Sequence, residues 1–119
     1  MLLRVIAAGA VVLLSLGSAI AQEEKAPAGN AAQGKRVFMT DGCFQCHGTV
    51  GQGGRVTGPR IARTELPFAA FLNQLRNPSN EMPPYEEPVL SDRDAADIYA
   101  FLRSLPPPPS ASSIPLLNH

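Results

Sequence analysis

The chain has no tryptophan, two tyrosines and five phenylalanines in 119 residues. A small domain with so few large apolar side chains is marginally stable on its own, and this weakly favours a bound cofactor that adds apolar mass to the core. Ten basic residues balance ten acidic ones without any basic cluster, so the composition gives no reason to expect nucleic-acid binding. Sustained alternation of apolar and polar residues is also absent, as are internal repeats, and the sequence therefore predicts no sheet.

Long apolar runs are absent beyond the N-terminus. Residues 1–4 carry one positive charge, residues 5–14 form an apolar run, and Ala19-Ile20-Ala21 has the small residues of a cleavage site. Residues 1–21 are therefore predicted to be a secretory signal peptide, and the expected location is the periplasm. The alternative is an uncleaved anchor, because residues 5–21 number 17, at the lower end of the about 17–25 needed to span a bilayer.

Removal of the signal peptide would leave 98 of the 119 residues, enough for one small domain with nine basic and ten acidic side chains. We expect a flexible lead-in over residues 22–30, the folded domain over residues 31–105, and a Pro-rich, disordered tail over residues 106–119.

The sequence predicts three helices, over residues 31–40, 64–76 and 91–105. The first ends at the Asp41-Gly42 turn, and apolar spacing and capping residues mark the other two. Thr64 is expected to cap the second helix, with Pro67 in its first turn. Its apolar face combines Phe68, Phe71, Leu72 and Leu75.

The third helix has the clearest signals. Ser91 and Asp94 have the spacing of a capping box, although Asp replaces the usual Glu or Gln. The proline run that begins at Pro106 ends the helix. Its expected buried stripe consists of Ala95, Ile98, Leu102 and Leu105.

Both cysteines of the chain and one of its two histidines lie in Cys43-Phe44-Gln45-Cys46-His47. This C-x-x-C-H pattern is typical of covalent c-type haem attachment. Two thiols three positions apart can reach the two vinyl groups on one edge of a porphyrin. The imidazole that follows then lies under the ring. We therefore expect thioether bonds from Cys43 and Cys46, and axial ligation of the iron by His47.

Four elements in order resemble those of the small class I cytochromes c, monohaem electron carriers of the bacterial periplasm. They are a helix with Gly34 and Phe38, the attachment site, Gly58-Pro59, and Met82 followed by prolines ahead of an aromatic C-terminal helix. The resemblance covers residues 31–105. It implies an all-α class I cytochrome c fold, with three main helices and loops wrapped around one covalently bound haem c.

The resemblance also implies particular contacts. Gly34 and Phe38 on the first helix would pack against Phe101 and Leu102 on the last. The ring N–H of the ligating histidine would donate to the carbonyl of Pro59. Arg60 and Arg63 are candidates for neutralising a haem propionate, and Asn77 and Tyr85 for a hydrogen bond near the methionine or a propionate.

The second axial ligand separates function classes. Met82 is followed by two prolines, which forbid a helix and stiffen an extended loop. Such a loop can hold a thioether against the iron, in the His/Met pattern of cytochromes c. Met39 lies only four residues before Cys43 and should stay on the His47 side. The other candidate is the terminal His119.

His/Met ligation would leave no open position for a small-molecule substrate, and it favours Fe(II) and a fairly positive potential. The expected function is a periplasmic one-electron carrier between redox enzymes (a dehydrogenase on one side, an oxidase or reductase on the other) that contacts membranes only through these partners. The alternative is a dedicated cytochrome subunit of a periplasmic dehydrogenase complex, and the apolar tail would suit such docking.

Three rival interpretations belong to other classes. In a haem enzyme or gas sensor, Met82 would not bind and the iron would be five-coordinate. A thiol–disulfide oxidoreductase would use Cys43 and Cys46, but the expected βαβ context is absent. A structural zinc site needs four ligands, and the sequence clusters only three.

Overall fold

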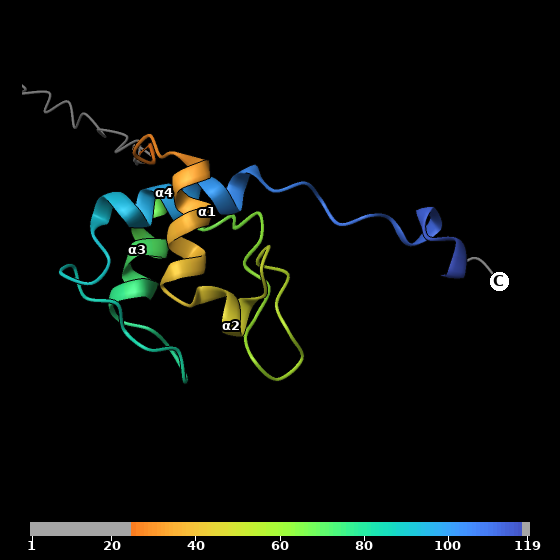
Figure 1. The fold of residues 1–119 in the computed structure, drawn as a ribbon, viewed down its shortest axis with the longest axis horizontal. Coiled ribbons are helices and arrows are strands. Elements are labelled where there is room, and N and C mark those ends of the chain that lie inside the picture. The colour runs from red at the N-terminus through yellow and green to blue at the C-terminus, as the bar shows by residue number, and fades with distance from the viewer. Residues whose placement is uncertain (1–24, 118–119) are drawn as a thin grey trace, which may run out of the picture.

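A computed structural model describes residues 25–117. Within this range it contains four α-helices and no strand, and one isolated antiparallel bridge joins Gly54 to Gly58. The predicted all-α class is confirmed, and a short fourth helix joins the three expected ones. In chain order the elements are α1 (Ala31–Thr40), α2 (Cys43–His47), α3 (Phe68–Arg76), α4 (Asp92–Ser104) and the 3-10 helices η1 (Ala111–Ser113) and η2 (Pro115–Leu117) (Figure 1).

The predictions for the two ends of the chain, the signal peptide and the disordered tail, stay predictions. The signal peptide and His119 lie outside the described residues. Residues 25–30 and 106–110 have no regular secondary structure, and the tail runs away from the helices in an extended path (Figure 1). Disorder of the tail stays a prediction. No helix in the described part of the chain is long and apolar enough to cross a membrane.

The predicted first helix is confirmed as α1. The side chain of Asn30 caps it by accepting a hydrogen bond of 3.0 Å from the backbone N–H of Gln33, which satisfies one of the free donors of the first turn. Gly34, Val37 and Phe38 are buried, and their i, i+3, i+4 spacing gives the helix one apolar face.

The predicted start of the second helix is wrong. Helix α3 begins at Phe68, four residues after Thr64, and its N-cap is Pro67. Leu66 precedes that proline, and the ring of a proline disfavours the helical conformation of the residue before it. The hydroxyl of Thr64 accepts a hydrogen bond of 3.3 Å from the Leu66 N–H, which makes a local turn in place of a helix cap.

The remainder of α3 agrees with the prediction. The helix ends at Arg76, because Asn77 precedes Pro78 and cannot easily continue it. Phe71 and Leu75 are buried, and Phe68 and Leu72 pack against the same cluster.

Ser91 caps α4 as predicted, since its side-chain oxygen accepts a hydrogen bond of 3.1 Å from the Asp94 N–H. The Asp94 carboxylate accepts from the Ser91 hydroxyl at 2.7 Å, whereas the longer Glu of a full capping box reaches back to the N-cap backbone. Ala95, Ile98 and Leu102 are buried as expected, and Leu105 is only partly buried.

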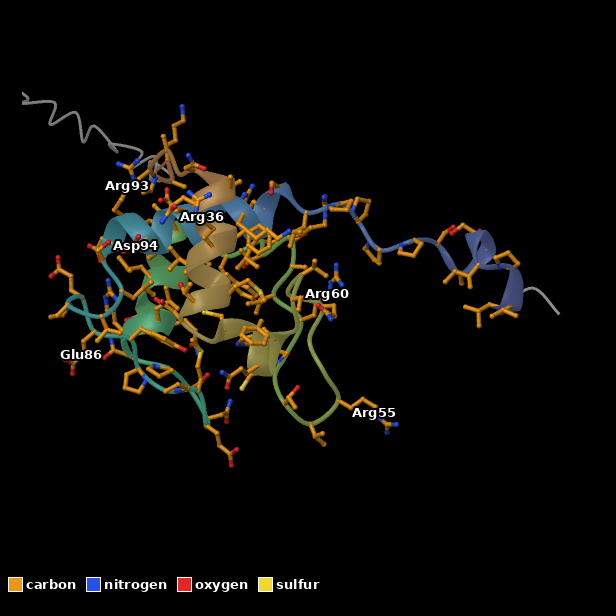
Figure 2. The ribbon with its side chains drawn as sticks, viewed as in Figure 1. Arg36, Arg55, Arg60, Glu86, Arg93 and Asp94 are labelled. Atoms are coloured by element: carbon orange, nitrogen blue, oxygen red, sulfur yellow. The ribbon has the colours of Figure 1, made fainter. Side chains whose placement is uncertain are left out.

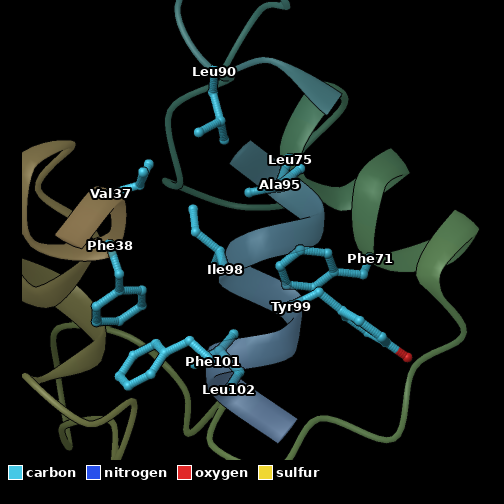
Figure 3. Packing of buried hydrophobic residues seen from close by; sticks show 10 residues of the cluster. All are labelled: Val37, Phe38, Phe71, Leu75, Leu90, Ala95, Ile98, Tyr99, Phe101 and Leu102. Carbon is cyan, nitrogen blue, oxygen red and sulfur yellow. The ribbon is translucent and has the colours of Figure 1, made fainter. Parts of the chain in front are cut away.

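Helix α4 lies between α1 and α3 and contributes side chains to both contacts (Figure 3). On the α1 side the rings of Phe38 and Phe101 have centroids 5.5 Å apart, so the aromatic pair implied by the resemblance is present. On the α3 side the ring of Tyr99 contacts Phe71 at 5.2 Å and Phe68 at 5.4 Å. Helix α4 therefore joins its contacts with α1 and with α3 into one hydrophobic core.

Gly34 allows α1 and α4 to approach closely. A Cβ atom at this position would lie 1.9 Å from the Asp97 carbonyl oxygen, a backbone atom that cannot rotate away. Gly34→Ala should therefore push the helices apart and lower the free energy of unfolding of the haem-loaded protein by about 1–3 kcal/mol, the usual cost of overpacking. Urea unfolding measures this effect. Lys35→Ala, on the exposed side of the same helix, is the control, and an equal loss in both variants would contradict the account.

Candidate functional site

The residues of the attachment motif lie on the short helix α2. Gly42 precedes it in the left-handed conformation, with φ of 79°, and Gly48 ends it with φ of 77°. A helix of five residues is too short to show an apolar period, which is why sequence reasoning missed it. The helical spacing i, i+3, i+4 places Cys43, Cys46 and His47 on one face.

The two thiols differ in their surroundings. Cys43 is partly buried and Cys46 is exposed, and no disulfide joins them. Cys43 also packs against the hydrophobic cluster of α1, α3 and α4. One sulfur therefore lies at the apolar core and the other at the surface.

His47 is buried, with 9% of the residue's surface exposed. Its Nδ1 lies 2.8 Å from the Pro59 carbonyl oxygen. A carbonyl oxygen can only accept, so Nδ1 carries the ring proton and donates it. The neutral ring then keeps its lone pair on Nε2, the form in which histidine binds metals. The structure thus contains the contact that the resemblance implied between these two residues.

The loop between α2 and Pro59 folds back onto the end of the helix. The Gly53 N–H donates to the His47 carbonyl at 2.7 Å, and the Thr57 hydroxyl donates to the Cys46 carbonyl at 2.9 Å. These bonds satisfy carbonyls that a helix end leaves free. Sequence reasoning read this stretch as loop and did not assign a role to Thr57 or Gly53, because the contacts depend on the path of the backbone.

Met82 packs against the same hydrophobic cluster as Cys43. Its Sδ accepts a hydrogen bond of 3.8 Å from Nε2 of Gln74 on α3. Tyr85, three residues later, donates from its hydroxyl to the Asp41 carbonyl at 3.3 Å, just before α2. The loop that carries the methionine is therefore fastened to the segment that leads into the attachment helix.

Met39, the rejected candidate ligand, lies in the last turn of α1 and also packs against the hydrophobic cluster.

Arg60 and Arg63, the two arginines suggested as partners of a haem propionate, lie near the end of α4 and the start of the tail. Nη1 of Arg63 donates to the Leu105 carbonyl at 3.0 Å, at the end of α4. Arg60 and Arg63 line, together with Arg103, an open hollow of about 420 Å³ next to the start of the tail, and Arg60 points outward (Figure 2). A propionate role for either residue stays a prediction.

The environment of Cys43 is unfavourable for thiol–disulfide exchange. Burial, followed by the nearby Asp41 carboxylate, raises the pKa of the Cys43 thiol to about 11. Catalytic C-x-x-C cysteines have a lowered pKa, because the thiolate is the attacking form. Burial likewise raises the pKa of Tyr85.

The zinc alternative would need four converging donors. No group of three or more His, Cys, Asp or Glu side chains within residues 25–117 is arranged to hold a metal ion.

A sequence profile of the family described as cytochrome C oxidase, cbb3-type, subunit III matches residues 29–102. The chain belongs to this family. The match spans 74 of the 119 residues and includes α1, the attachment motif, Met82 and nearly all of α4. Comparisons with curated proteins and with solved structures found no match.

Membership identifies the protein as a small monohaem cytochrome c with covalently bound haem c, and its function as haem-based electron transfer. The residues present fit this group. Two thiols lie one helical turn apart, a buried imidazole beside them keeps Nε2 free, and a thioether packs against the same apolar cluster. Thiol, imidazole and thioether are the protein donors of a c-type site.

Gly53 is the loop position on which the imidazole contact depends. Its φ is +77°, and an added Cβ would lie 2.5 Å from the Arg60 backbone nitrogen and 2.8 Å from the Pro59 carbonyl carbon. Gly53→Ala should displace Pro59 from His47 and lower the free energy of unfolding of the haem-loaded protein by about 1–3 kcal/mol.

Chemical denaturation monitored by haem absorbance measures the loss. Val56→Ala, in the same loop, is the control, because Val56 is 96% exposed and its truncation should cost little. A full-sized loss in Val56→Ala together with none in Gly53→Ala would contradict this account of the loop.

Proposed function

We propose that this protein is a periplasmic one-electron carrier in which Cys43 and Cys46 hold haem c through thioethers and His47 and Met82 bind its iron. The observation that carries the proposal is the buried His47, which donates from Nδ1 to Pro59 at 2.8 Å and so leaves Nε2 available on the same short helix as both thiols. Location in the periplasm follows from the predicted signal peptide, and thioether attachment takes place on that side of the membrane.

Each residue has a separate task. Haem c, when bound, supplies the one-electron change between Fe(II) and Fe(III). The Pro59 carbonyl orients the His47 ring and strengthens its donor nitrogen. Met82 contributes a neutral thioether from an apolar setting, which favours the reduced state and raises the potential. With both axial positions held by protein, no position is left for a substrate, and the protein carries electrons without catalysing a reaction.

The surface near the attachment helix suits a weakly charged partner. Cys46 is exposed, and in the following loop Val50 is 45% and Val56 is 96% exposed. Without the predicted signal peptide, nine basic and ten acidic side chains would remain, a formal charge of −1. A dehydrogenase, oxidase or reductase would therefore dock mainly through apolar contacts, with a modest dependence on salt.

Met82→Ala tests the ligation directly. The variant should keep its covalent haem but become high-spin in the ferric state, bind imidazole or cyanide readily, and lose on the order of a hundred millivolts of midpoint potential. Absorption spectra and a redox titration provide the measurement. An unchanged spectrum would show that the ligand lies elsewhere, and it would return the five-coordinate or other-ligand alternatives to consideration.

A second candidate is a dedicated subunit of a redox complex. The family description names an oxidase subunit, and the tail exposes Leu116 (78%) and Leu117 (62%), apolar side chains that a partner subunit could cover.

Deletion of all residues after Leu105 distinguishes the two candidates. A free carrier should keep its spectrum and its rates of electron transfer with soluble partners, because the contacts of the helical core end before the tail. A subunit that docks through the tail should instead stop copurifying with its complex. Copurification of the truncated protein would remove the tail-docking idea.

A further inference from the structure

Residues 77–85, here called the methionine loop, leave the end of α3 and return to it. At the start, the Asn77 N–H donates to the Asn73 carbonyl at 2.7 Å. At the return, the Tyr85 N–H donates to the Leu75 carbonyl at 2.8 Å. Both ends of the loop are thus fixed to the last turn of one helix, and Met82 lies three residues before the return point.

Arg76 closes the neck of the methionine loop. Arg76 is the last residue of α3, and the methionine loop begins directly after it. Its Nη1 donates to the Tyr85 carbonyl at 2.6 Å, where the loop ends, and its Nη2 donates to Asp92 Oδ1 at 2.5 Å in the first turn of α4. The Arg76 side chain is only 20% exposed. A planar guanidinium can serve both acceptors at once, which a lysine ammonium cannot do with the same geometry.

The position of Tyr85 constrains that of Met82. Only Pro83 and Pro84 separate them, and both have a fixed φ that leaves the segment little freedom. Tyr85 is further held by its hydroxyl, which donates to the Asp41 carbonyl at 3.3 Å. A movement of the Tyr85 backbone is therefore passed on to the thioether rather than absorbed between the two residues.

We propose that Arg76 is a positioning residue for Met82: its contacts with Tyr85 and Asp92 hold the methionine loop where the thioether can reach the iron. The proposal rests on the ligation by Met82 proposed above. Without these contacts of Arg76, the methionine loop samples other arrangements, and the fraction of molecules with Met82 bound to the iron falls. An external ligand that competes for the same iron position then binds more tightly in proportion.

The experiment is an imidazole titration of the full-length ferric protein with its haem. Arg76→Met keeps most of the aliphatic stem but removes the guanidinium group and its hydrogen bonds to Tyr85 and Asp92. We expect about tenfold tighter apparent imidazole binding. Haem content and helical circular dichroism should be unchanged. If Arg76→Met does not accumulate, Arg76→Lys serves in its place, and it should also tighten binding because one ammonium cannot hold both acceptors.

Arg93→Met is the matched control. Arg93 forms the other arginine–carboxylate pair among the described residues, with Asp97 at 3.6 Å, and that ion pair does not involve the methionine loop. This variant should leave imidazole affinity unchanged, even if its thermal stability falls. If Arg76→Met lowers the thermal stability but leaves the imidazole affinity at the wild-type value, Arg76 acts on stability alone, and that result would overturn the proposal.

Combining substitutions separates the positioning role from the ligation itself. Met82→Ala should bind imidazole tightly, and adding Arg76→Met should have no further effect, because the methionine through which Arg76 acts is gone. A further tightening in the double variant would overturn the positioning role. If Met82→Ala changes imidazole affinity but neither Arg76 variant does, only the positioning role fails. If Met82→Ala changes nothing, the proposed ligation fails, and the positioning role with it.

Discussion

One hydrogen bond, from Nδ1 of His47 to the Pro59 carbonyl, is the interaction on which the site depends. It fixes the ring orientation and the tautomer together, because the carbonyl can accept only from a protonated Nδ1. The glycine-rich loop returns Pro59 to this point by bonding to the two last carbonyls of α2. If the loop did not bring Pro59 to His47, the orientation of the imidazole ring would not be fixed, and the two thiols alone would not define an iron site.

The helical core supplies a rigid frame for two separate groups of donors. Helix α2, which follows α1, carries the cysteines and the histidine, while the methionine loop begins at the end of α3. Helix α4 packs against both α1 and α3, and the close approach at Gly34 fixes the first of these contacts. The bond from the Tyr85 hydroxyl to the Asp41 carbonyl then joins the two groups directly. The proposed ligands His47 and Met82, which lie 35 positions apart in the sequence, are thereby both held by one small core.

Sequence reasoning identified the class of fold and the chemistry because both rest on local patterns. The spacing of Cys43, Cys46 and His47 needs only one helical turn, and the periodic apolar faces of α3 and α4 were readable directly. It failed at Thr64, where the effect of a proline on the preceding residue outweighed a good capping side chain. It also did not predict the hydrogen bonds of Arg76 with Tyr85 and Asp92, because they join segments that only the tertiary fold brings together.

The most direct test of the central claim, that Met82 is the second axial ligand of the iron, is proton NMR of the ferrous protein with isotope-labelled methionine methyl groups. A methyl group held over the face of a porphyrin is shifted far upfield by the ring current, outside the range of ordinary side chains. The account predicts one such methionine signal, which persists in Met39→Leu and disappears in Met82→Ala. A ferrous protein with no shifted methionine methyl, or one whose shifted signal disappears in Met39→Leu, would contradict it.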